Sequence, residues 1–393
     1  MPDRLLLTFN PGSSTIKIGL FQVEGGCARR IGKGMLDFQK QPLVFRLTEG
    51  VEKSEIPLKA SASGDLHGVL DETLGWLAHH FSLDGLAAAG HRVVHGGEHF
   101  TGPVRIDDES FKAISNLVPL APLHQPQSVR LIQALRHLRP QLMQTASFDT
   151  AFHATQTDLV RRFALPRALH DRGIKRYGFH GLSYKFIVGE LERSFADIAK
   201  GRVVVAHLGS GASLCALHDG ISRDTSMSFS TLDGIPMATR CGALDPGVLL
   251  HLFGQEKQSL AALEDMLYHQ SGLLGVSGIS GDSRLLLESD RAEASQALDL
   301  FALRIGGEIA RLAATLGGLD ALVFTAGIGE HQPEIRAAIC RRLAWLGLAV
   351  DGSANEGNAA AISTYRSKIA VLVIATDEEQ VIADEAVSLI LPA

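Results

Sequence analysis

Short apolar runs alternate along the chain with longer stretches of helical spacing. Apolar runs with the length of buried strands occupy residues 5–7, 321–325 and 370–375. Apolar residues recur at helical spacing over 66–81, 108–116, 184–197, 259–270, 332–346 and, over the longest stretch, 290–316. The five residues AGIGE at 326–330 are expected to form a turn, and a final helix is expected after a cap at Thr376 and Glu379. This alternation of strands and helices predicts an α/β fold.

The stretch at residues 5–20 (LLLTFNPGSSTIKIGL) predicts a strand, a tight turn and a second strand. Its turn offers backbone N–H groups, the hydroxyls of Ser13 and Thr15 and the ammonium of Lys17, all of which suit phosphoryl oxygens. Taken alone, the stretch is equally compatible with an ordinary polar hairpin. Residues 203–217 (VVVAHLGSGASLCAL) repeat the plan 198 positions later with negligible identity. Two such hairpins, one opening each half of the chain, would face each other across a cleft.

Composition narrows the class of protein. At 393 residues, with 46% hydrophobic and 20% charged residues, the chain can bury two or three domain cores. A net charge of −6 argues against a sequence-independent nucleic-acid binder. No apolar run reaches the ~20 residues that span a bilayer, and the N-terminal apolar run is too short for a signal peptide. Four cysteines without C-x-x-C spacing indicate reduced thiols in a cytoplasmic protein.

Several familiar motifs are missing from the sequence. No Walker loop and no G-x-S-x-G elbow occur, and the glycines Gly209 and Gly211 lack the third member of a dinucleotide fingerprint. Instead, single polar residues stand in turns between apolar strands. Asp149 follows a strand, at the end where α/β ligand sites gather, and His124 precedes a helix. These isolated polar residues are Asn10, Lys17, Arg92, His124, Asp149, His180, Arg240 and Glu378.

Eight segments, in order, resemble the acetate kinase family, within the superfamily of acetate and sugar kinases, Hsp70 and actin. They are NPGSSTIK, GHRVVHGGE, APLH, FDTAFH, YGFHG, TRCGALDPG, SGLLGVSGIS and FTAGIGE. The resemblance covers essentially the whole chain and implies two ribonuclease-H-like domains with an interdomain cleft, the actin-like ATPase fold. It places an N-terminal domain at 1–149, completed by a helix at about 380–393, and a nucleotide-binding domain at 150–379. It also implies a homodimer.

The resemblance further implies reversible phosphoryl transfer from ATP to acetate, giving acetyl phosphate and ADP, with Mg²⁺ or Mn²⁺ as the cofactor. A carboxylate acceptor is already ionised at pH 7, so no strong general base is required. The difficulty is to bring two anions together, and planar, permanently charged guanidinium groups suit that task. We accordingly expect Arg92 to bind the acyl carboxylate and Arg240 to bind the transferring phosphoryl group.

The remaining roles are also implied by the resemblance. His180 would donate to the phosphoryl oxygens, with His124 as a second donor, and Asp149 would position the nucleophile or hold Mg²⁺ through water. Asn10 and Glu378 match the residues that the family places near the metal ion, and Mg²⁺ in such sites keeps several waters. Val94, Leu123 and Phe179 would line the acyl pocket. The nucleotide would contact Ser13, Thr15, Lys17, His207, Leu208, Gly209, Ser210, Gly211, Asp282, Ser283, Arg284, Gly327, Ile328, Gly329, Glu330 and His331.

Several positions depart from the family pattern, namely Ser210, Thr231, Ala238, His331, Asp377 and the segment Leu182-Ser183-Tyr184, where Thr-Ser-His is usual. They leave the preferred nucleotide and the preferred acid open, because one methylene shifts specificity by only about 10–200-fold and propionate could compete with acetate. A kinase acting on a longer acid or a sugar is an alternative, and for a sugar Asp149 would be the essential base. An ATP-gated interaction protein of the Hsp70 or actin type is a third.

Overall fold

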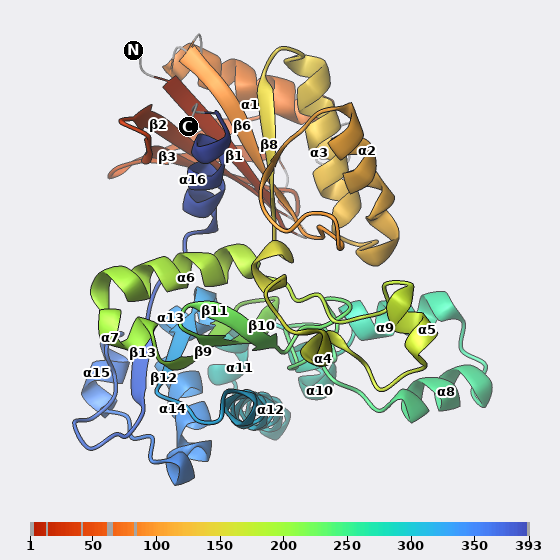
Figure 1. The fold of residues 1–393 in the computed structure, drawn as a ribbon, viewed down its shortest axis with the longest axis vertical. Coiled ribbons are helices and arrows are strands. Elements are labelled where there is room, and N and C mark those ends of the chain that lie inside the picture. Colours follow the sequence, from red (N-terminus) through yellow and green to blue (C-terminus); the bar gives the residue numbers. More distant parts are fainter. Residues whose placement is uncertain (1–3, 13–14, 41, 61–65, 82–84, 391–393) are drawn as a thin grey trace. The chain divides into compact units, whose positions relative to one another are not determined.

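The computed structural model describes residues 4–12, 15–40, 42–60, 66–81 and 85–390, so Ser13 of the predicted phosphate turn lies outside it. The chain divides into two compact units, which are described separately. Unit 1 comprises Met1–Phe152, Gly181–Phe186 and Asp377–Ala393, and unit 2 comprises His153–His180 and Ile187–Thr376 (Figure 1). Compared with the expected domain bounds, unit 1 additionally takes residues 150–152, 181–186 and 377–379.

Unit 1 contains a mixed sheet whose eight described strands lie in the order β5-β4-β3-β2-β1-β6-β8-β7. The first five strands form an antiparallel meander, and β6 and β8 then continue from β1 in parallel. The strands are β1 (Arg4–Pro11), β2 (Thr15–Glu24), β3 (Cys27–Asp37), β4 (Val44–Glu49), β5 (Glu52–Pro57), β6 (Leu86–Val93), β7 (Val104–Arg105) and β8 (Met143–Phe148). The helical elements are α1 (Leu66–Phe81), α2 (Asp108–Asn116), η2 (Val118–Leu120), α3 (Gln125–Leu138), η3 (Ala151–His153) and α16 (Glu378–Ile390).

Helices cover both faces of the unit 1 sheet, which explains why its first strand is a continuous apolar run. Leu7 packs in the cluster that includes residues of α1 and α3. Its neighbour Leu6 belongs to the cluster on the opposite face, with Ala383 and Val387 of α16 (Figure 1). Helix α16 lies so close to the sheet that a Cβ at Gly90 would meet Ile382 Cγ2 at 2.7 Å. The end of the chain is therefore an integral layer of unit 1.

Unit 2 repeats the central part of this arrangement. Its described sheet has the order β11-β10-β9-β12-β13, with three antiparallel strands followed by two parallel ones, as in β3-β2-β1-β6-β8. The offset of 198 residues that aligns the two hairpins also aligns Arg4 with Arg202, where β1 and β9 begin. The repeated arrangement is the ribonuclease-H-like one that the resemblance implied.

The strands of unit 2 are β9 (Arg202–Leu208), β10 (Ala212–His218), β11 (Ile221–Thr225), β12 (Ala321–Thr325) and β13 (Ala370–Val373). Helix α6 (Gly181–Ser194) begins in unit 1 and continues in unit 2. The other helices of unit 2 are α4 (Asp158–Arg161), α5 (Arg167–Asp171), α7 (Ala196–Ala199), α8 (Pro246–Gly254), α9 (Leu260–His269), α10 (Gly272–Ser277), α11 (Ser283–Leu287), α12 (Ala292–Leu316), α13 (Ala326–His331), α14 (Pro333–Arg342), η4 (Ala344–Leu346) and α15 (Gly352–Glu356). Within the described ranges, no helix is both long and apolar enough to cross a membrane.

Several predicted local features are wrong. The AGIGE stretch forms helix α13 rather than a turn. Helix α12 begins at Ala292 rather than at residue 290, and its N-cap Arg291 makes no side-chain cap hydrogen bond. Helix α6 begins at Gly181, three residues before the expected start. At α16 the cap is Asp377, whose Oδ1 accepts from Gln380 N at 3.1 Å, which gives this departure from the family pattern a structural role.

Two buried histidines predict acid-dependent stability. Burial lowers the pKa of His91 to about 4, offset only in part by Gln144, and burial likewise lowers that of His153 to about 4. The ordinary histidine pKa is ~6.5, so the unfolded chain takes up these protons first. The stabilisation is complete above pH ~6.5 and is lost as the pH falls to about 4, by roughly 3 kcal/mol for each histidine. We expect urea unfolding to show that the free energy of unfolding falls less between pH 7 and 5 in His91→Gln than in the unsubstituted protein. Equal falls in the two proteins would contradict the role of His91 in acid-dependent stability.

Candidate active site

The polar residues of unit 1 gather at the carboxyl ends of three neighbouring strands. Asn10 lies near the end of β1, Arg92 in β6, and Asp149 directly after β8. Because β1, β6 and β8 are adjacent and parallel, their carboxyl ends share one edge of the sheet. Helix α16 begins at this edge, with Glu378 as its first residue.

Arg92 forms the centre of this cluster. Its Nε donates to Asp149 Oδ1 at 3.0 Å and its Nη2 to Asp149 Oδ2 at 2.6 Å, a two-pronged pair. Its Nη1 donates to Asn10 Oδ1 at 3.0 Å and lies 3.7 Å from Glu378 Oε2. Burial disfavours the charge of Arg92, but the carboxylates of Asp149 and Glu378 outweigh burial and hold its pKa above the ordinary value. Arg92 is thus fixed in place as a cation.

The Asn10 amide organises the acidic side of the cluster. Its Nδ2 donates to Glu378 Oε2 at 2.8 Å and to Glu379 Oε1 at 2.7 Å. Glu379 is buried and was absent from the predicted site, because the sequence assigned it to capping of the last helix. Lys17 faces Asn10 across the β1–β2 hairpin and is exposed. Lys17 of the predicted phosphate site therefore lies beside this cluster.

Three carboxylates and one guanidinium give the cluster a net charge of −2 when all are ionised. Carboxylate and amide oxygens are ligands of the kind that Mg²⁺ takes, and Mg²⁺ uses few direct protein ligands. No group of three or more His, Cys, Asp or Glu side chains in the part of the chain that the structure describes is arranged to hold a metal ion directly. The donor chemistry of Asp149, Glu378 and Glu379 therefore fits a magnesium ion that keeps most of its water.

A second cluster lies in unit 2 around His180 and Arg240. His180 Nδ1 is 2.8 Å from Ser213 Oγ, and its ring stacks on His207 at 4.3 Å between centroids. A Cβ built on Gly211 would lie 3.6 Å from His180 Nε2 and 3.7 Å from Arg240 Nη1. The two nitrogens therefore lie at van der Waals distance from one point beside Gly211. Two nitrogen donors converging on such a point can bind an oxyanion.

The loop that carries Arg240 is held by the start of α10. Leu273 N donates to Met237 O at 2.9 Å, and Arg240 Nη1 donates to Thr231 O at 3.2 Å. Gly272 has a φ of 60°, and a Cβ there would lie 2.1 Å from Met237 O. No side chain fits this crossing without moving the loop.

Gly272→Ala is therefore expected to displace the Arg240 loop. We expect kcat of the phosphoryl transfer proposed below to fall about 100-fold, since small misplacements of a reacting group cost this much. The Tm is expected to fall as well. The matched control is Gly278→Ala, at another positive φ with open space around it, which adds backbone strain without a clash. Equal kcat values in the two variants would contradict this account.

Helix α13 of unit 2, which contains the GIGE residues, is held by two charged side chains. Glu330 Oε1 accepts from Ala326 N at 2.8 Å and from Thr376 N at 3.1 Å, tying together the segments that follow β12 and β13. The fully buried Arg336, absent from the predicted site, donates from Nη1 to Gly329 O at 2.9 Å. Glu330, predicted to contact the nucleotide, thus also ties its own helix to the segment after β13.

Other predicted residues are placed as follows. Asp282 caps α11 and pairs with Arg284 at 2.6 Å, and the Arg284 side chain is 74% exposed. His124 is the N-cap of α3 without a side-chain cap hydrogen bond. Ser210 and the side chain of His331 are exposed. The acyl-pocket candidates divide into the buried Val94 and Phe179 and the exposed Leu123. The other residues predicted to contact the nucleotide lie in or next to named elements. They are Thr15 and Lys17 in β2, His207 and Leu208 in β9, Gly209 and Gly211 beside β10, Ser283 in α11, and Gly327 and Ile328 in α13.

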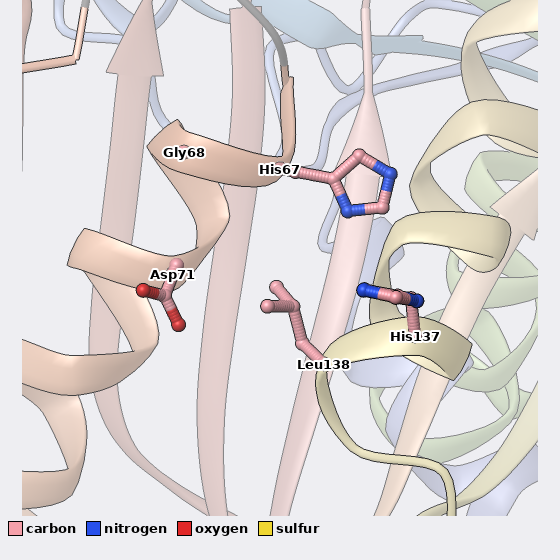
Figure 2. A pocket seen from close by; sticks show the side chains of 5 residues that line it. All are labelled: His67, Gly68, Asp71, His137 and Leu138. Atoms are coloured by element: carbon pink, nitrogen blue, oxygen red, sulfur yellow. The ribbon is translucent and has the colours of Figure 1, made fainter.

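A hollow of about 460 Å³ in unit 1 lies away from these clusters, between α1 and α3. Figure 2 shows the side chains of His67, Asp71, His137 and Leu138 around it. The two imidazole rings meet edge to face at 5.4 Å. None of the predicted site residues lines this hollow.

The fold and the two clusters define a phosphotransferase-like protein of two ribonuclease-H-like units. The model of the acetokinase family matches residues 5–384, and the chain belongs to this family. Acetate kinase of Methylocella silvestris is 44% identical, covering 99% of this chain and 98% of that protein. Among solved structures, a propionate kinase from Francisella tularensis has a TM-score of 0.90 at 34% identity, over 97% of this chain and 98% of that one. Porphyromonas gingivalis acetate kinase has a TM-score of 0.87 at 32% identity, over 99% and 100%.

Proposed function

We propose that the chain is an acetate kinase, which transfers the terminal phosphoryl group of ATP reversibly to the acetate carboxylate, giving acetyl phosphate and ADP. The observation that carries this proposal is the convergence of His180 Nε2 and Arg240 Nη1 beside Gly211. Family membership supports the same reaction.

Each cluster supplies part of this chemistry. Arg92 binds the acetate carboxylate with the N–H groups that Asp149 and Asn10 leave available, and its positive charge reduces repulsion between the two anionic reactants. His180 and Arg240 donate to the oxygens of the transferring phosphoryl group, where negative charge is greatest in the transition state. Acetate attacks through an oxygen that is already ionised, so no residue has to remove a proton.

Mg²⁺ would be held at the acidic cluster of unit 1. Asp149 and Glu378 would bind its waters, with Asn10 fixing the orientation of Glu378. When bound, the ion neutralises charge on the phosphate chain of the nucleotide. Lys17 and Thr15 would contact that phosphate chain, and the glycines of 209–211 and 327–329 would allow the backbone to approach the nucleotide closely.

A hydroxamate-trapping assay tests the reaction and the preferred acid. Formate, acetate, propionate and butyrate are compared with ATP and with GTP, and the acyl phosphate formed is trapped by hydroxylamine. We expect the highest kcat/KM with acetate and ATP. Propionate as the best acid would replace the proposal with a propionate kinase, an alternative favoured by the structural similarity to the Francisella protein. No product with any acid would refute the carboxylate kinase.

We also propose that two copies of the chain associate through α8 and the start of α9. Helix α8 is rich in apolar residues and none of them is buried, with Leu250 72% and Phe253 52% exposed. Leu260 at the start of α9 is 71% exposed. A gathering of large apolar side chains at a surface marks an interaction site, and a homodimer is the assembly that the family resemblance implied.

Light scattering after size-exclusion chromatography tests this association. We expect twice the mass of 42.1 kDa for the unsubstituted chain and the monomer mass for Leu250→Lys combined with Phe253→Lys. Val51→Lys, at a 97% exposed position of unit 1, is the control and should stay dimeric. A monomeric unsubstituted chain would refute the proposal.

We further propose that the enzyme works in the cytoplasm, without a nucleic-acid or membrane partner. The four cysteines are free thiols, and the net charge of −6 disfavours binding to polyanions.

A further inference from the structure

A cross-strand pair of residues in unit 2 holds the His180 imidazole from two directions. Ser213 of β10 lies directly opposite His207 of β9 in the antiparallel register. Ser213 bonds the edge of the ring at 2.8 Å, and His207 stacks on its face at an angle of 17°. We propose that Ser213 is a positioning residue that sets the orientation of His180 for phosphoryl binding, an inference that rests on the proposed function.

The position of the bond on the ring carries this inference. An imidazole that turns by half a revolution about its Cβ–Cγ bond exchanges Nδ1 with a carbon, and Nε2 moves to the place of Cε1. The bond between Ser213 Oγ and His180 Nδ1 is lost in the turned ring. The observed orientation places Nε2 3.6 Å and Cε1 3.8 Å from a Cβ on Gly211. A turned ring would place Nε2 3.8 Å from the same point, so the two orientations differ in the direction of the Nε2–H bond rather than in reach. Ser213 thereby selects the direction in which His180 donates to the phosphoryl group.

A serine hydroxyl also suits both donor forms of the ring. It can donate to Nδ1 of the neutral imidazole that carries its proton on Nε2. It can equally accept from Nδ1–H of the imidazolium. In both forms Nε2 carries a hydrogen for the phosphoryl oxygen, so the hydroxyl serves the reaction whichever form is present.

Rigid surroundings make this selection effective. Ser213 is fully buried and His207 is 7% exposed, and both belong to central strands of the unit 2 sheet. His180 itself lies at the N-cap of α6 with a φ of 57°, a backbone conformation that residues other than glycine rarely adopt. The sheet therefore holds Ser213 and His207 in place, and the turn at His180 brings its imidazole ring against them.

The test measures acetyl phosphate formation by Ser213→Ala in two backgrounds. In the unsubstituted enzyme we expect kcat to fall about tenfold, with KM for acetate and for ATP changed less than twofold. In a His180→Ala background, the same Ser213→Ala change should lower kcat less than twofold further, because no ring remains to be oriented. Ser213→Cys, of similar shape but with a weak donor, should show the same dependence on background and replaces Ser213→Ala if that variant does not fold.

Ser226→Ala is the matched control. Ser226 is also buried, and its Oγ accepts at 2.8 Å from the backbone N–H of Leu214, the neighbour of Ser213 in β10. We expect it to lower the Tm while keeping kcat within twofold. An equal kcat loss on Ser213 substitution in both backgrounds, or a loss below twofold in the unsubstituted enzyme, would overturn the inference. Failure of the proposed function is distinct, because the unsubstituted enzyme would then form no acetyl phosphate.

Discussion

Arg240→Ala is expected to lower kcat by about 10³-fold. The guanidinium approaches the point beside Gly211 at which His180 also arrives, so it is placed to stabilise charge that grows on the transferring phosphoryl group. Arginines in this role contribute about 10³–10⁵-fold in phosphoryl transfer. Steady-state kinetics with ATP and acetate measure the loss. Arg240→Lys keeps the charge without the planar fork and should recover only part of it.

The fold should survive the removal of Arg240. Its Nη1 donates to Thr231 O and contacts Met237 Sδ at 3.7 Å, and neither partner is a charged group that would be left unpaired. We expect the Tm to stay within a few degrees. Arg366→Ala removes an exposed arginine that contacts Tyr365 and is the control for loss of charge alone. A loss below tenfold for Arg240→Ala would remove this residue from its proposed role.

Arg92→Ala is expected to impair the use of acetate and the stability of unit 1 together. The kcat/KM for acetate should fall by about 10²–10³-fold, as for loss of a charged group that contacts the reactants, while KM for ATP changes less than threefold. Asp149 is only 1% exposed, and the substitution removes the cationic partner of this buried carboxylate. Such a loss costs about 3–5 kcal/mol of the free energy of unfolding.

A second substitution separates these two effects. Asp149→Asn in the Arg92→Ala background removes the buried negative charge, so urea unfolding should show part of the stability restored. Activity should not return, because the acetate-binding group is still missing. The role proposed for Arg92 fails if the variant loses nucleotide affinity more than carboxylate affinity.

Sequence patterns were most informative where local geometry decides the structure. The predicted strand–turn–strand units became β1–β2 and β9–β10, since apolar runs bounded by turn residues specify hairpins without help from distant parts of the chain. The rule about the carboxyl ends of strands pointed to Asp149, and the family resemblance assigned Asn10 and Arg92 to the site. These residues could therefore be named before the structure was known.

Residues whose roles depend on distant contacts escaped the sequence prediction. Glu379 has the pattern of a helix cap, and only the packing of α16 on the sheet brings it to Asn10. Ser213 stands in an apolar strand, where a small polar residue carries no signal of its own. The helix at 326–331 is short and glycine-rich, and distant contacts hold it: Glu330 accepts from Thr376 N, 46 positions away, and the buried Arg336 is anchored on Asn355.

The bond between Asn10 and Glu378 joins residues 368 positions apart. During synthesis on a ribosome, the first strand emerges long before the helix that completes its cluster. Until that helix is made, Leu6 and the sheet surface at Gly90 have no covering layer, and the acidic side of the cluster does not exist. A nascent chain without α16 therefore lacks part of the cluster, and a product truncated before residue 378 would carry an exposed apolar sheet that invites aggregation.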